Sequence, residues 1–266
     1  MRTLSKYLKV YGVFLKNSVM SQMEYRANFI SRIVMEFVYL IIKILYVLVI
    51  GGVGASVSGI TADSMLIYVG TYSILTGLYC AVFYVNFSRI SSSVRTGELD
   101  LWFVKPMSLQ FLITTRHFDV GLPIPNVLGG AILVGLGYRN SGIPFSALTV
   151  AGYILFLLLG LALIYCVFLI PHIVCFWMVN TTEIGRFSNT FWDINNVPMD
   201  IFPSYVKRFL SFGIPVFLMV NLGPQYILGT LKPFSVALVL IMIALWWTIS
   251  RLVWKAALRC YSSVNS

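Results

Sequence analysis

A polar segment from Arg89 to Met107 interrupts a chain that is otherwise strongly apolar. Only 11% of the chain is charged, yet this segment carries Arg89, Arg95, Glu98, Asp100 and Lys105. Each of these ions would cost at least a few kcal/mol in hydrocarbon, so the segment must face water. The run before it, Met65 to Phe87, contains no charge, and the chain becomes apolar again after Arg116. The segment is therefore predicted to be a loop between two membrane spans.

The composition supports a protein with several membrane spans, because 59% of the residues are hydrophobic and the mean hydropathy is +0.87. Soluble globular domains are much less apolar. The net charge of +10 is spread over the loops and forms no single basic stripe, which indicates topology signals and anionic-lipid contacts and disfavours nucleic acid. The cysteines lack CxxC spacing and lie mostly in apolar runs, so neither disulfides nor a metal site are expected: Cys80, Cys166, Cys175 and Cys260.

The N-terminal stretch, Arg2 to Gln22, has apolar side chains near one helical face and lysines toward the other. This pattern predicts an amphipathic helix in the membrane interface. Its lysines also interrupt any continuous apolar centre, so no cleavable signal peptide is expected and the N-terminus should stay cytoplasmic.

Apolar runs predict membrane spans at about residues 29–50, 65–87, 120–136, 147–179 and 233–253. Pro171 is the expected break in the longest run. The basic C-terminal residues also favour the cytoplasm, so the number of crossings should be even, and six fits better than four.

Two segments compete for the fifth crossing. One is Phe209 to Leu231, which leaves Lys207 and Arg208 in the cytoplasm as positive-inside counting favours. The other is the polar segment of residues 177–197, which could cross only if it were buried in protein or lined water. In that case the proline-punctuated region after it would fold back on the outer side.

Charged residues inside the first span point to a function or to an interface. Glu36 and Lys43 lie seven positions apart and share one helical stripe, which must face protein or water. They could form the polar wall of a substrate path or a seam between subunits, as could Glu183, Arg186 and Asp193 in the later polar segment. Alternatively, Glu36 pairs with Arg32 and Lys43 extends its ammonium to the interface.

The polar segment itself has the outline of a docking element. Ser91 to Ser93 offer N-cap oxygens, Gly97 can form a left-handed turn, and Pro106 would end a short helix. Such a helix would carry acids on one side and Leu99, Trp102 and Phe103 on the other. The alternative is a solvated loop that only holds positive-inside charges.

Several catalytic motifs are missing. The sequence has no Gly-Lys pair and hence no phosphate-binding loop, and it contains neither HExxH nor G-x-S-x-G. An intramembrane enzyme is therefore disfavoured, and energy for uphill transport would have to come from a partner.

The motifs taken together resemble those of ABC-2 type exporter permeases. EYRANF, from Glu24 to Phe29, resembles their N-terminal region. RTGELDLWFVKPMS, Arg95 to Ser108, is similar to R-x-G-x-L-D-x-x-L-x-[KR]-P-x-S, with Phe103 replacing the usual leucine. VPMDIFPSYVKRFLSFGIPVFLMVNLGP resembles the family's Y-P-x-x-I-[YF]-P…I-[LI]-P…Y-x-P ending, although Val197 replaces the tyrosine and Leu222 breaks the last pattern.

The resemblance implies an all-α polytopic membrane protein of the type V exporter class, with six transmembrane helices and both termini cytoplasmic in a bacterial inner membrane. Residues 1–266 would form one transmembrane domain. Within it, residues 1–22 would be an interfacial connecting helix, residues 88–108 a cytoplasmic coupling loop, and residues 198–230 an outer re-entrant hairpin marked by Pro198, Pro203, Pro215 and Pro224.

The resemblance also implies partners and roles. The chain would need no cofactor of its own, because two ABC ATPase subunits would hold ATP and Mg, and it would pair with a second permease, identical or related. The ATPase-coupling residues would be Arg95, Gly97, Glu98, Asp100, Trp102 and Pro106. The expected function is export of an amphiphilic drug, peptide or lipid-like substrate; the alternative is a scaffold or sensor subunit that does not transport.

Overall fold

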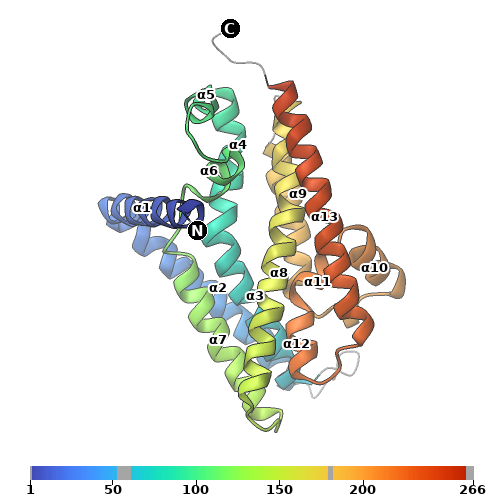
Figure 1. Cartoon of the computed structure of the whole chain (residues 1–266). Coiled ribbons are helices and arrows are strands. Elements are labelled where there is room, and N and C mark those ends of the chain that lie inside the picture. Colours follow the sequence, from blue (N-terminus) through green and yellow to red (C-terminus); the bar gives the residue numbers. More distant parts are fainter. Residues whose placement is uncertain (1, 53–60, 179–181, 262–266) are drawn as a thin grey trace.

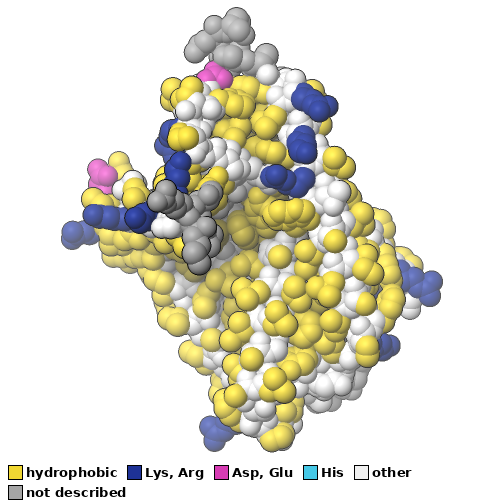
Figure 2. Space-filling model, viewed as in Figure 1, with side chains coloured by type: hydrophobic (Ala, Val, Ile, Leu, Met, Phe, Trp, Pro, Cys, Tyr) yellow, Lys and Arg dark blue, Asp and Glu magenta, His cyan; other side chains and the backbone are white. Residues whose placement is uncertain are grey.

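The computed structural model describes residues 2–52, 61–178 and 182–261, and these residues form helices and turns without any strand. Three helical stretches in this part are long and apolar enough to cross a membrane: Ala62–Arg95, Ala147–Phe176 and Pro233–Cys260. Hydrophobic side chains cover most of the side of the bundle, whereas Lys and Arg gather mainly toward its upper part (Figure 2). The prediction of an all-α membrane protein is therefore confirmed for the described residues.

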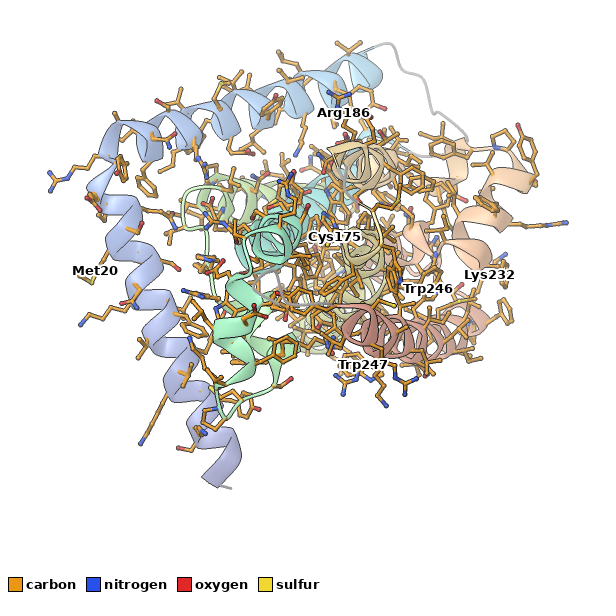
Figure 3. The ribbon with its side chains drawn as sticks, turned by 90° about the horizontal axis from the view of Figure 1, so that it is seen from above. Met20, Cys175, Arg186, Lys232, Trp246 and Trp247 are labelled. Atoms are coloured by element: carbon orange, nitrogen blue, oxygen red, sulfur yellow. The ribbon has the colours of Figure 1, made fainter. Side chains whose placement is uncertain are left out.

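The first two helices are α1 (Arg2–Glu24) and α2 (Arg26–Gly52). The chain turns at Tyr25, so that α1 lies across the long axis of the other helices while α2 runs down the outside of the bundle (Figures 1 and 3). The predicted N-terminal helix is therefore present. Its half-buried face packs on the protein, and Leu8 and Met20 are exposed on the other.

One continuous helical stretch contains α3 (Ala62–Tyr79), a π-helical turn (Cys80–Tyr84) and α4 (Val85–Arg95). α7 (Pro123–Asn140) packs closely against α3. Gly70 and Gly130 allow this approach, because a Cβ on either residue would lie 2.6 Å from the carbonyl oxygen of the other. The second and third predicted spans thus form a tight pair.

The other long pair is α8 (Ala147–Ile173) and α13 (Pro233–Cys260), which pack along each other. Pro171 lies in the last turn of α8, which ends two residues later and continues as a short 3-10 helix (Val174–Phe176). The helix therefore ends close to the predicted break. Side chains of α8 such as Leu163, Ile164 and Leu169 are fully buried in the main core.

The chain between α8 and α13 consists of short helices. They are α9 (Thr182–Asp193), two 3-10 turns (Ile194–Asn196 and Met199–Ile201), α10 (Ser204–Arg208), a π-helical turn (Phe209–Gly213), α11 (Val216–Val220) and α12 (Leu222–Ile227).

Neither candidate for the fifth crossing is a long helix. The first alternative, a span from Phe209 to Leu231, does not form one helix, because the helix ends at Gly213 before Pro215 and α11 and α12 follow as separate helices. In the segment 177–197, residues 179–181 lie outside the described part, and the helix that follows them has 12 residues. The fold-back alternative, in which residues 177–197 cross the membrane, stays a prediction.

The short helices α11 and α12 are buried against the first half of α8. A Cβ on Gly160 of α8 would lie 2.2 Å from the carbonyl oxygen of Met219, and one on Gly152 would meet the ring of Tyr226. α12 therefore lies at the opposite end of the molecule from α5 (Figure 1). Pro203, which precedes α10, is exposed. The other prolines of this segment are buried: Pro198, Pro215 and Pro224.

Candidate functional site

The predicted docking element is the short helix α5 (Glu98–Phe103), which follows a left-handed turn. Gly97 has φ 68°, a conformation that costs a glycine little, so its predicted role in the turn is confirmed. The predicted N-cap at Ser91 to Ser93 is wrong, because α4 continues through these serines to Arg95. α5 thus begins directly after the glycine.

The two acids of α5 bond within the chain. Glu98 accepts hydrogen bonds from the Ser93 hydroxyl (2.9 Å) and from the Arg116 guanidinium (3.2 Å). Arg116 also lies 5.0 Å from the centre of the Trp102 ring. Asp100 accepts a hydrogen bond from the hydroxyl of Tyr261, at 3.1 Å, and so ties α5 to the residue after α13.

The side chains of α5 that face outward are apolar. Leu99 and Trp102 are buried, whereas Leu101, Phe103 and Val104 are 66%, 49% and 83% exposed. We call these three exposed residues the α5 tip. Because both carboxylates already bond within the chain, the surface that the α5 tip offers to a partner is hydrophobic.

Helix α1 holds the segment after α5. The Lys6 ammonium donates to the carbonyl oxygen of Pro106 at 3.0 Å, and the backbone N–H of Ser108 donates to the Tyr7 hydroxyl at 3.0 Å. The Tyr7 ring also packs edge-on against Phe111 of α6 (Leu109–Thr115), with centroids 4.7 Å apart. α1, α5 and α6 therefore form one connected unit at this end of the bundle.

The charged stripe of α2 faces protein, as predicted. The Arg32 guanidinium bonds to Asp119 at 2.8 Å, and Glu36 accepts from the Asn126 amide at 2.6 Å. The alternative pairing of Glu36 with Arg32 is therefore wrong. Lys43 also points inward, because its ammonium donates to the Ser73 hydroxyl at 3.2 Å.

Lys43 and Asp193 meet at one aromatic residue, Tyr72 of α3. The Lys43 ammonium lies 4.9 Å from the centre of its ring, and its hydroxyl donates to Asp193 at 3.2 Å. Trp192 stacks on the same ring with centroids 5.5 Å apart. Residues of α2, α3 and α9 thus converge on a single aromatic and charged cluster, which we call the Tyr72 cluster.

The other two predicted path residues lie elsewhere. Glu183 and Arg186 pair with each other at 3.0 Å near the start of α9, and both side chains are 74% exposed. An exposed pair at this spacing contributes little to stability. The structure therefore brings Lys43 and Asp193 together, links Glu36 to α7, and leaves the Glu183–Arg186 pair on the surface.

A small cavity lies between α8, α9 and α13. It has a volume of about 140 Å³ and is lined by residues that include Phe168, Ser188 and Trp246. Trp246 lies on the inner side of α13 and Trp247 on its outer side (Figure 3). The Ser188 hydroxyl and the Trp246 indole N–H are buried without a hydrogen-bond partner.

No group of His, Cys, Asp and Glu in the described ranges is arranged to hold a metal ion. Sequence reasoning missed most partners of the site, namely Asn126, Ser73, Tyr72 and Tyr261. They lie between 30 and 161 positions from the residues that they contact, and no local pattern in the sequence links them.

A family model described as ABC-2 family transporter protein matches residues 37–265. No curated protein and no solved structure matches the chain.

Proposed function

The chain belongs to the ABC-2 transporter family, whose model covers most of its length, and on that premise we propose that it is the permease subunit of an ATP-driven exporter. The family has a membrane role in ABC transport and implies a separate ABC ATPase partner. In the proposed complex, two ATPase subunits supply ATP and Mg, and a second permease, identical or related, completes the pathway.

The observation that carries this proposal is the α5 tip. Its apolar residues stand at one end of the bundle, where Leu101 and Val104 are largely exposed and Phe103 is half-exposed beside the ring of Tyr261, with centroids 5.9 Å apart. Exposed apolar side chains in a loop with satisfied polar groups are typical of a contact with another protein. We therefore assign the contact with the ATPase to Leu101, Phe103 and Val104.

The predicted coupling residues then hold the α5 tip in place. Gly97 sets the turn, Glu98 and Asp100 bond to other elements, and Trp102 is buried under Arg116. The Pro106 carbonyl binds α1. Arg95, the last residue of α4, is exposed, and we propose that it contacts the ATPase directly.

A displacement of α5 by an ATPase would be transmitted to the helices of the membrane domain. α4 is continuous with α3, and α3 carries Tyr72, so movement of α5 would change the surroundings of the Tyr72 cluster. We propose that Lys43, Asp193 and Glu36 line the cargo path or the seam with the second permease. An amphiphilic cargo suits this mixture of rings and charges.

The deciding experiment is affinity purification of the tagged permease from its native membrane with identification of what co-purifies. We expect an ATPase subunit and a permease, together with ATP hydrolysis that depends on Mg. A permease that purifies with other membrane proteins but never with an ATPase would favour the scaffold or sensor alternative.

The proposed topology has six spans, both termini in the cytoplasm, and residues 198–230 as an outer hairpin in a bacterial inner membrane. It predicts that a cysteine at Ser204, which is exposed, reacts with an impermeant thiol reagent in intact cells after the native cysteines are replaced. A cysteine at Ser92, which is exposed near the end of α4, should react only after permeabilisation. The opposite pattern would invert the topology.

A further inference from the structure

A cavity of about 480 Å³ lies between α1 and the segment that joins α6 to α7. Gln22 of α1 fixes this wall, because its amide donates to the carbonyl of Phe118 at 2.6 Å and accepts from the N–H of Val120 at 3.0 Å. The Ser18 hydroxyl accepts from the N–H of Phe118 at 3.1 Å. The cavity is thus built by specific bonds between distant segments, and its volume is that of a small-molecule site.

Among the charged side chains that line this cavity, four are basic: Arg32, Arg89, Lys105 and Arg116. Its one acidic residue, Asp119, already binds Arg32 and accepts from the backbone N–H of Gly121 at 2.9 Å. Arg89 and Lys105 have no ion pair among the described residues. The cavity therefore holds positive charge that the described chain does not neutralise.

His117 lies in the same lining and reports this positive environment. Burial, with Arg89 and Arg116 nearby, lowers the pKa of His117 to about 4. The imidazole is therefore neutral near pH 7 and adds no positive charge of its own to the cavity. A bound anion would pair with Arg89 and Lys105, since Arg116 already bonds to Glu98.

The cavity opens beside the interfacial helix. The outer side of α1 exposes Leu8, Val13 and Met20, which suits contact with lipid at the membrane surface. Basic pockets between the helices of membrane proteins can bind the phosphate headgroups of lipids. We propose that this cavity binds an anionic phosphate group, carried by a membrane phospholipid or by a soluble phosphate compound, with Arg89 and Lys105 as its direct ligands.

The site does not depend on what the chain transports, so it can be tested on the purified full-length permease in detergent. Native mass spectrometry would compare short-chain phosphatidylglycerol with short-chain phosphatidylcholine. We expect phosphatidylglycerol to be retained and phosphatidylcholine not. Each removed charge, in Arg89→Gln or Lys105→Gln, should weaken binding about fivefold. The matched control is Arg139→Gln, an exposed arginine at the end of α7 outside the cavity, and it should have no effect.

The two sources of phosphate are separated by competition. If inorganic phosphate or glycerophosphate displaces the lipid, the ligand is a soluble phosphate compound; if neither does, the ligand is a lipid headgroup, and both results support the site. Three results would each overturn the proposal. The first is equal retention of the two lipids, and the second is that the permease binds neither lipid and no phosphate. The third is that Arg89→Gln and Arg139→Gln have equal effects. The comparison of the two lipids on the unaltered chain tests the proposed site even where a variant fails to fold.

Discussion

A permease that carries Leu101→Glu and Val104→Glu is expected to insert and fold normally but to lose its ATPase subunit on purification. Both side chains are largely exposed at the α5 tip, so the free permease loses little when they are changed. In the complex, the same carboxylates would be desolvated without a partner. Apolar anchors of this kind contribute about 2 kcal/mol or more, which is roughly thirtyfold in affinity.

The measurement is the ratio of ATPase to permease after affinity purification, with ATP hydrolysis of the reconstituted complex as a second readout. The control, Phe145→Glu, places the same charge on an exposed aromatic residue just before α8, at the other end of the bundle. It should leave the ratio unchanged. Normal ATPase binding by the double variant would show that the α5 tip is not the contact.

A second variant tests whether the ATPase binds the apolar side chains of the α5 tip or the acidic side chains of α5. Asp100→Asn keeps an oxygen that can accept from the Tyr261 hydroxyl, and it removes the charge. If the ATPase recognised that charge, this variant should lose its partner. We expect it to keep the ATPase, because the structure commits both acids of α5 to bonds within the chain.

Local patterns in the sequence predicted the elements of this site better than their partners. The left-handed turn at Gly97 and the protein-facing stripe of Glu36 and Lys43 follow from conformational preference and from the cost of charge in lipid. The hydrogen bonds of these two residues with Asn126 and Ser73 could not be predicted from the sequence, because each depends on how α2 packs against α7 and α3.

The wrong N-cap shows how tertiary packing overrides a local signal. Ser91 to Ser93 would suit the start of a helix, but Phe87 and Ile90 of α4 are almost fully buried in the main core. Continuing α4 past the serines keeps that packing and the bond from Ser93 to Glu98. Burial of large side chains contributes more than one N-cap hydrogen bond.

The segment of residues 209–231 shows the limit of hydropathy. It is apolar enough to suggest a span, but the prolines and glycines in it favour short helices, and α11 and α12 are buried by protein. An average over a window measures apolar content and does not distinguish burial in lipid from burial against α8.

The largest loss of stability is expected from Gly130→Val in α7. A Cβ at this position would lie 2.6 Å from the carbonyl oxygen of Gly70 and 3.0 Å from the backbone nitrogen of Ile74, and neither backbone atom can move without shifting α3. α3 and α7 would have to separate over the most extensive contact between two helices of the described chain. We expect loss of monodisperse protein in size-exclusion chromatography, or a fall of several degrees or more in melting temperature.

The same helix supplies the control, since a Cβ at Gly135 meets nothing within 4 Å and Gly135→Val should leave the elution profile unchanged. Gly130→Ala should fall between the two, because it adds the clashing Cβ without the branched methyl groups. If Gly130→Val and Gly135→Val were equally stable, the close α3–α7 approach would be wrong. Since α3 runs on through α4 to α5, a partly folded Gly130→Ala permease should also bind its ATPase more weakly than the Gly135→Val control, which connects packing in the membrane to the contact at the α5 tip.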